Sequence, residues 1–167
     1  MNEQDLLRSE AAAIRRAFQE CRLDGDLSWI TTSFPHACCG VVSSILSHHL
    51  FTIGMPDVKR ASGVRIDQQS HMWVEAGEWI IDITADQFDE VSEPVLVTQN
   101  RTWHQQFSFD FEYLDAGFAG YSDEAIHASV YRAILLTEVM QSRALPTRRQ
   151  CSQDTPVHGS TGLGSQS

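Results

Sequence analysis

The chain has 167 residues, 42% of them hydrophobic, and carries 22 acidic against 12 basic residues, for a formal net charge of −10. This length supports one domain with a substantial core and is too short for two. An acidic surface repels phosphate, so nucleic acid and anionic membranes are poor partners, and basic substrates are mildly favoured.

The N-terminal region is charged throughout and has no apolar segment typical of a secretory signal. No apolar stretch approaches the length of a membrane-spanning helix. The four cysteines, Cys21, Cys38, Cys39 and Cys151, do not have the spacing of a disulfide framework, because two are adjacent. We therefore expect a cytoplasmic protein with reduced thiols.

Apolar residues recur at steps of three and four over residues 4–22, which predicts an amphipathic helix. A loop is expected over 27–37, and a second helix is expected to begin at Cys38 or Cys39. The residues predicted to face inward are Leu7, Ala11, Ile14, Phe18 and Cys21 on the first helix, and Val42, Ile45, Leu46, His49 and Leu50 on the second.

Residues 58–67 are predicted as a strand or extended segment, and residues 70–84 as a β-hairpin around Ala76-Gly77. A strand is expected over 94–98 and an irregular aromatic-rich stretch over 103–121. The last helix is expected over about 122–143, with an inward face formed by Ile126, Val130, Ala133, Ile134 and Thr137.

The composition changes at Pro146, after which Val157 and Leu163 are the only large aliphatic residues. Such a segment cannot bury enough apolar surface to offset the entropy lost on ordering. We expect a single domain over residues 1–145 and a disordered C-terminal tail over residues 146–167.

The hairpin suggests a pair of functional side chains. A two-residue loop at Ala76-Gly77, or a four-residue loop over 75–78, places His71 directly opposite Asp82, on the same face, with Cβ atoms roughly 5 Å apart. A loop of three residues would place Asp82 on the other face. Asp82 interrupts an apolar strand, where an unpaired carboxylate is costly, so a partner for it is expected.

The second helix brings a candidate nucleophile. The partial positive charge at a helix N-terminus lowers the pKa of a thiol there, and Cys39 lies at the expected start of this helix. Gly40 permits close approach of a substrate backbone. Cys39 as nucleophile, His71 as base and Asp82 as the group that orients the base follow the triad logic of acyl transfer.

The resemblance of the chain to a known superfamily is carried by FPHACCGVVSSILSHHL and HMWVEAGEWIIDITADQF. These segments resemble the core of the transglutaminase-like, papain-related cysteine enzymes, in which a Cys opens a helix, a His-x-Trp strand follows and an Asp lies on the next strand. The resemblance covers about residues 33–90. It favours Cys39 over Cys38 as the nucleophile, because similar sequences place the nucleophile directly before the Gly.

We accordingly expect an α+β fold: an antiparallel sheet of about four strands, with the Cys39 helix on one face and the terminal helices around it. The resemblance implies a peptidase, an amidase or deamidase, or a transglutaminase-type enzyme. Its substrate would be a protein or peptide, with a thioester intermediate and no metal or organic cofactor. Further residues are candidates to line the substrate pocket, namely Cys38, Trp73 and Gln87.

Several alternatives stay open. The backbone N–H of Cys39 can bind the oxyanion, while the second donor is undecided among Trp29, Thr32 and His36. His104 lies either near the site or on the surface, and Glu75 is expected to be solvated. Two alternatives to an enzyme also stay open. The chain could be a catalytically inactive binding module of the same fold, or a zinc protein that uses His36, Cys38, Cys39 and His49, although their spacing matches no known zinc motif.

Overall fold

The computed structural model describes residues 2–116, 118 and 124–144. Five strands form one antiparallel sheet in the order β4-β3-β2-β1-β5, which confirms an α+β fold with one strand more than expected. The predicted tail, 146–167, lies outside the described residues. The strands are β1 (Val58–Val64), β2 (Ser70–Ala76), β3 (Trp79–Asp82), β4 (Leu96–Thr98) and β5 (Phe109–Asp115).

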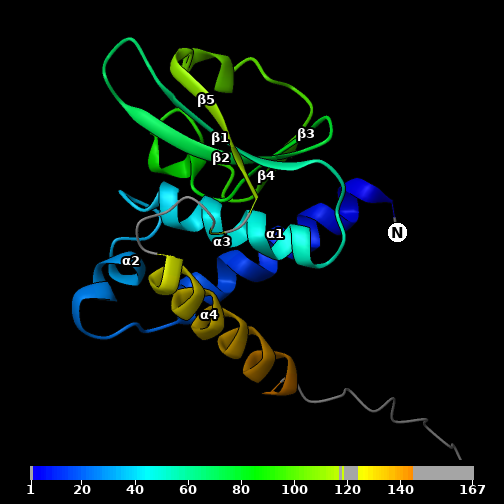
Figure 1. The fold of residues 1–167 in the computed structure, drawn as a ribbon, viewed down its shortest axis with the longest axis vertical. Coiled ribbons are helices and arrows are strands. Elements are labelled where there is room, and N and C mark those ends of the chain that lie inside the picture. Colours follow the sequence, from blue (N-terminus) through cyan, green and yellow to red (C-terminus); the bar gives the residue numbers. More distant parts are fainter. Residues whose placement is uncertain (1, 117, 119–123, 145–167) are drawn as a thin grey trace, which may run out of the picture.

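The α-helices lie on one side of the sheet (Figure 1). They are α1 (Glu3–Glu20), α2 (Ser28–Thr32), α3 (Cys39–Thr52) and α4 (Glu124–Ala144). Helices α1 and α3 contact the sheet directly, and α4 packs against both of them. Short 3₁₀ turns, η1 (Gly25–Leu27), η2 (Ala85–Gln87) and η3 (His104–Gln106), lie in the connecting segments.

The inward faces predicted for the first two helices are buried, apart from His49, which is half-buried. They pack against Val74 and Ile81 of the sheet in the larger apolar core. On α4, Val130 and Ile134 are buried as expected, whereas the prediction for Ile126 was wrong, because its side chain is 38% exposed. The expected loop over 27–37 contains the short helix α2, where the Thr32 hydroxyl donates to the carbonyl of Ser28.

The opposite face of the sheet has a second apolar cluster, formed by Ala61, Trp73, Ile80, Phe88 and Phe107. Strand β5 borders this face, although its residues were expected to be irregular. Its side chains are mostly exposed, and it is held by backbone pairing to β1 at the edge of the sheet. Within the described residues, no helix is both long and apolar enough to cross a membrane.

The hairpin forms with a register different from the one expected. Val74 pairs with Ile81 and Ala76 with Trp79, so the two-residue loop is Gly77-Glu78. Gly77 has φ +56°, a conformation that favours glycine at the first central position of a hairpin turn. The pairing is shifted by two residues, and an even shift leaves every side chain on its expected face.

Candidate active site

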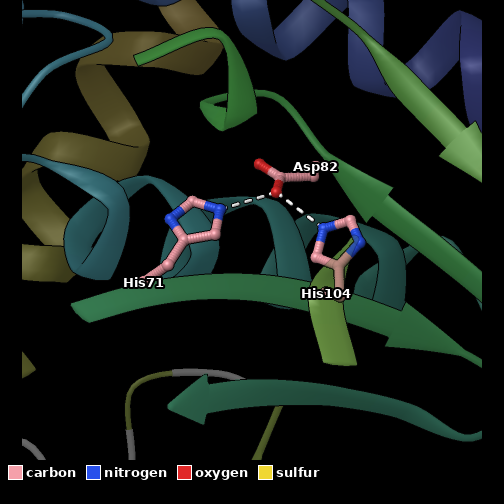
Figure 2. Close-up of side chains that lie close together, drawn as sticks. All are labelled: His71, Asp82 and His104. Carbon is pink, nitrogen blue, oxygen red and sulfur yellow. Dashed lines mark hydrogen bonds and ion pairs between the residues drawn. The ribbon is translucent and has the colours of Figure 1, made fainter. Parts of the chain in front are cut away.

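Asp82, the last residue of β3, is the centre of a buried hydrogen-bond network. Its Oδ2 lies 2.6 Å from Nε2 of His71 and 3.0 Å from Nε2 of His104, as Figure 2 shows. Its Oδ1 accepts hydrogen bonds from the backbone N–H of Thr84 at 2.9 Å and from the Thr84 hydroxyl at 3.3 Å. Four hydrogen-bond donors thus offset the free-energy cost of burying this carboxylate.

These donors also determine the charge of Asp82. Burial acts to raise the pKa of this carboxyl, but the positive charge on His71 and the hydrogen bonds from His104 and His71 hold the pKa well below its usual range. Asp82 is therefore an anion at any pH near neutrality, and both imidazoles must donate to it through Nε2–H.

His71 lies near the start of β2 and is fully buried. Burial favours the neutral imidazole, yet the charge of Asp82 and the hydrogen bond to it outweigh burial and raise the pKa of His71 to about 9. Its ring centroid is 5.1 Å from that of Phe88, 5.3 Å from that of Phe107 and 5.7 Å from that of Trp103. The imidazole is therefore held in one orientation and is protonated near neutral pH.

Cys39 is the first residue of α3 and is half-buried, and its thiol lies close enough to the His71 imidazole for that group to change the pKa of the thiol. Burial acts to raise the pKa of this thiol, but the hydrogen bond and charge of His71 and a backbone hydrogen bond from Met72 lower it below its ordinary value. Because Nε2 of His71 is bound to Asp82, Nδ1 is the nitrogen left for the thiol. The arrangement favours a thiolate–imidazolium pair.

Cys38 has the opposite environment. It is 1% exposed within the apolar core, where burial above all, together with the neighbouring Cys39, raises the pKa of its thiol to about 12. A buried, protonated thiol is a poor nucleophile. Of the two adjacent cysteines, only Cys39 lies where the chemistry expected from the sequence can occur.

Two of the three residues expected to line a substrate pocket lie beside His71, whereas the third, Cys38, is buried in the larger apolar core. The side-chain amide of Gln87 is 3.3 Å from Nδ1 of His71, and it donates to the carbonyl of Thr84 at 2.9 Å. The Trp73 ring centroid lies 5.9 Å from that of His71.

The segment after Asp82 is anchored to α1 by an ion pair. Arg15 donates two hydrogen bonds to the carboxylate of Asp86, at 2.9 and 2.6 Å, and a third to the carbonyl of Ile83 at 2.6 Å. Bidentate pairs of this kind restrict both partners. Gln87 follows Asp86 in η2, so this contact also positions the amide beside His71.

The structure decides two points about buried residues near the site, His104 and Glu75. His104, for which a place near the site was left open, is 3% exposed and binds Asp82 from η3. The expectation that Glu75 is solvated was wrong, because Glu75 is 5% exposed and accepts hydrogen bonds from Arg101 and Trp73. No local pattern marks the contact of His104 with Asp82 or that of Arg101 with Glu75, since His104 and Arg101 both come from the segment between β4 and β5.

Among the described residues, one group has the composition of a metal site: His71, Asp82 and His104, whose ligand atoms lie within 4.8 Å of one another. Tetrahedral zinc with bonds of about 2.0 Å keeps its ligand atoms about 3.3 Å apart. The 2.6 Å between His71 and Asp82 is a hydrogen-bond distance, so the present arrangement fits a proton network better than a metal centre.

The four residues of the zinc interpretation do not form such a group within the described part of the chain. His49 instead lies 2.8 Å from the carboxylate of Glu10 and 3.3 Å from the hydroxyl of Tyr131. No family model, curated protein or solved structure matches the chain. The functional interpretation therefore rests on the geometry of these side chains.

Proposed function

We propose that the chain is a thiol-dependent acyl-transfer enzyme that acts on peptide or carboxamide bonds through Cys39, His71 and Asp82. The observation that carries the proposal is that a half-buried thiol at the start of α3 lies near His71, whose Nε2 is 2.6 Å from Oδ2 of the buried Asp82. These are the nucleophile, base and orienting group of a triad.

The reaction follows from the charges of these groups. The Cys39 thiolate attacks the carbonyl carbon and forms a C–S bond, while the carbonyl π electrons move to oxygen. When the C=O bond re-forms, the C–N bond breaks, and the departing amine takes a proton from His71. Water or a second amine then loses a proton to His71, attacks the thioester and releases the Cys39 thiolate.

The oxyanion needs two donors. The backbone N–H of Cys39 has no partner within the helix, because it belongs to the first turn of α3. For the second donor, the Gln87 amide is better supported than Trp29, Thr32 or His36, since its Nε2 is 3.3 Å from the imidazole nitrogen that faces the thiol. Two such donors stabilise the charge that develops on the carbonyl oxygen.

The order of these residues along the fold supports membership of the transglutaminase-like, papain-related superfamily. Cys39 opens a helix packed on an antiparallel sheet, His71 lies on one strand and Asp82 ends the next. This membership implies a protein or peptide substrate. A buried network with a half-exposed thiol beside it favours an enzyme over an inactive binding module of the same fold.

Selective labelling followed by an activity screen tests the proposal. Iodoacetamide at low concentration near neutral pH should label Cys39 well before Cys21 and Cys38, both of which are buried. The chain should also cleave or deamidate members of a peptide library, or couple them to an added amine, as read by mass spectrometry, and the Cys39→Ser chain should not. Equal labelling of the cysteines together with an inert library would favour the binding module.

A further inference from the structure

Strand β5 is an open edge of the sheet. Among the described strands it pairs with β1 alone, and all of its residues except Leu114 are exposed. The opposite edge, β4, is covered by side chains of α1, because the carbonyl of Val97 accepts hydrogen bonds from Gln4 Nε2 at 3.3 Å and from Arg8 Nη2 at 3.4 Å. An edge strand presents a row of backbone N–H and C=O groups that can bind a further strand.

The side chains of β5 differ between its two faces. The rings of Phe111 and Tyr113 share one face, since their centroids are 5.0 Å apart, and they are 42% and 50% exposed. Glu112 lies between them in sequence and points to the other face, because successive side chains of a strand alternate. A strand added beside β5 would therefore meet aromatic rings on one face and a carboxylate on the other.

Both faces favour a strand that carries positive charge. Opposite charges on neighbouring strands stabilise a sheet, so Glu112 favours a basic side chain across from it. Aromatic rings attract cations, and Nζ of Lys59 already lies 5.3 Å from the centroid of the Tyr113 ring. The net charge of −10 attracts a basic partner over longer distances. A second copy of the chain would instead bring its own acidic β5 against this one, and like charges directly opposite each other are destabilising.

We propose that β5 is a docking edge for an extended basic segment of another protein. The segment adds to the sheet through backbone hydrogen bonds and places Lys or Arg side chains beside the two rings and Glu112. Pairing runs along residues 112–115, where β5 and β1 are in regular register, since the register shifts between Ser62 and Val64 opposite the start of β5. This binding involves no step at Cys39 and therefore goes beyond the proposed function.

The test uses the Cys39→Ala chain, so that no peptide is consumed by thiol chemistry, and the synthetic peptide acetyl-TKVKVKT-amide. In ¹H–¹⁵N NMR the peptide should bind saturably, shift the backbone amides of β5 and slow their hydrogen exchange. The same peptide with Glu in place of Lys should not bind. A version N-methylated along its backbone keeps the charges but loses the donors, and it should bind at least about tenfold more weakly. No binding of the lysine peptide, or equal binding of either control peptide, would overturn the proposal.

Substitutions localise the binding. Glu112→Lys should weaken it about tenfold, because an attractive cross-strand pair becomes a repulsive one. Asp26→Lys, at an exposed residue of η1, changes the net charge equally and should bind nearly as the parent does. Phe111→Ala should weaken binding about threefold, whereas Phe51→Ala, at a residue 60% exposed on α3, should not.

Two results would overturn the proposal at this stage. Equal effects of Glu112→Lys and Asp26→Lys would show a long-range attraction without pairing at β5. Protection of the β5 amides that rises with protein concentration in the absence of peptide would assign the edge to a second copy of the chain. Neither result bears on the reactivity of Cys39, so the proposed function is tested separately.

Discussion

His71 and Asp82 are joined by a 2.6 Å hydrogen bond although they are not directly opposed across the hairpin. The observed register, continued by one step, sets Asp82 level with Trp73, so His71 is its diagonal neighbour on the same face. Diagonal neighbours lie about 7–8 Å apart at Cα, a separation that an imidazole and a carboxylate can span. This diagonal pairing positions the base that the proposed chemistry requires.

Asp82→Asn is expected to lower the rate of acyl transfer by a factor on the order of 10³–10⁴, because the orienting carboxylate of a triad is lost. The pKa of His71 should fall towards its ordinary value, since the charge of Asp82 raises it. Turnover of a cleaved library peptide measures the first effect. A rate within a factor of about two of the parent chain would contradict the role of Asp82.

The activity should decline at alkaline pH. The departing amine takes its proton from His71, whose pKa is about 9, so the rate of acylation should fall as the pH rises through that value. A profile of kcat/KM against pH measures this decline. A rate that keeps rising beyond that pH would show that proton donation by His71 does not limit the reaction.

Stability should follow the same ionisations. The folded pKa of His71 lies above its unfolded value, so its contribution is complete below about pH 6.5 and is lost as the pH rises through about 9. The pKa of Asp82 is depressed, so its contribution is present above about pH 4 and is lost as the pH falls. Urea unfolding across this range should show both losses in the Cys39→Ala chain, while Asp82→Asn in the same background should have a flatter profile.

His104 is expected to act as a positioning residue. His104→Leu removes one donor from Asp82, which then holds the proton of His71 more strongly, so the alkaline limb of the rate profile should move to higher pH. The rate itself should fall about tenfold or more, since hydrogen bonds to charged groups contribute about 1.5–3 kcal/mol. His104→Gln, which keeps an N–H donor, should restore much of the rate. A profile with an unmoved limb in His104→Leu would indicate a merely structural residue.

Gly63 is expected to tolerate no side chain. It pairs with His71 across β1 and β2, and a Cβ there would lie 2.1 Å from the carbonyl oxygen of Phe107. Gly63→Ala should therefore lower the free energy of unfolding by about 1–3 kcal/mol, the usual cost of overpacking. Gly40→Ala, whose Cβ would meet only the Met72 sulfur at 3.4 Å, is the matched control and should unfold nearly as the parent does.

The sequence predicted the parts of the fold that depend on local periodicity. The buried faces of α1 and α3 follow from apolar residues spaced at three and four, and the hairpin follows from two β-rich runs. The predicted position of the turn was wrong. Gly77, whose φ is positive, is the first residue of the two-residue loop, whereas it was expected to be the second. The face shared by His71 and Asp82 was still predicted, since the error in register is even.

The remaining features depend on contacts between distant residues. Residues 109–113 of strand β5 alternate between aromatic and acidic, but β5 is an exposed edge strand and has no buried apolar run to reveal it. His104 reaches Asp82 from a 3₁₀ turn 22 positions away, and Arg101 reaches Glu75 from 26 positions away. No spacing rule predicts such contacts, because both His104 and Arg101 lie in the irregular segment between β4 and β5, whose path does not follow from a local pattern.

The pH dependence of Cys39 alkylation tests the central claim most directly, because it measures the thiolate in place and needs no substrate. In the parent chain the midpoint should lie below the ordinary thiol pKa of about 8.5, since His71 lowers it. In His71→Ala, where burial acts unopposed by the imidazole, the midpoint should rise to that value or above. A parent midpoint at or above the ordinary value, unchanged by His71→Ala, would contradict the account.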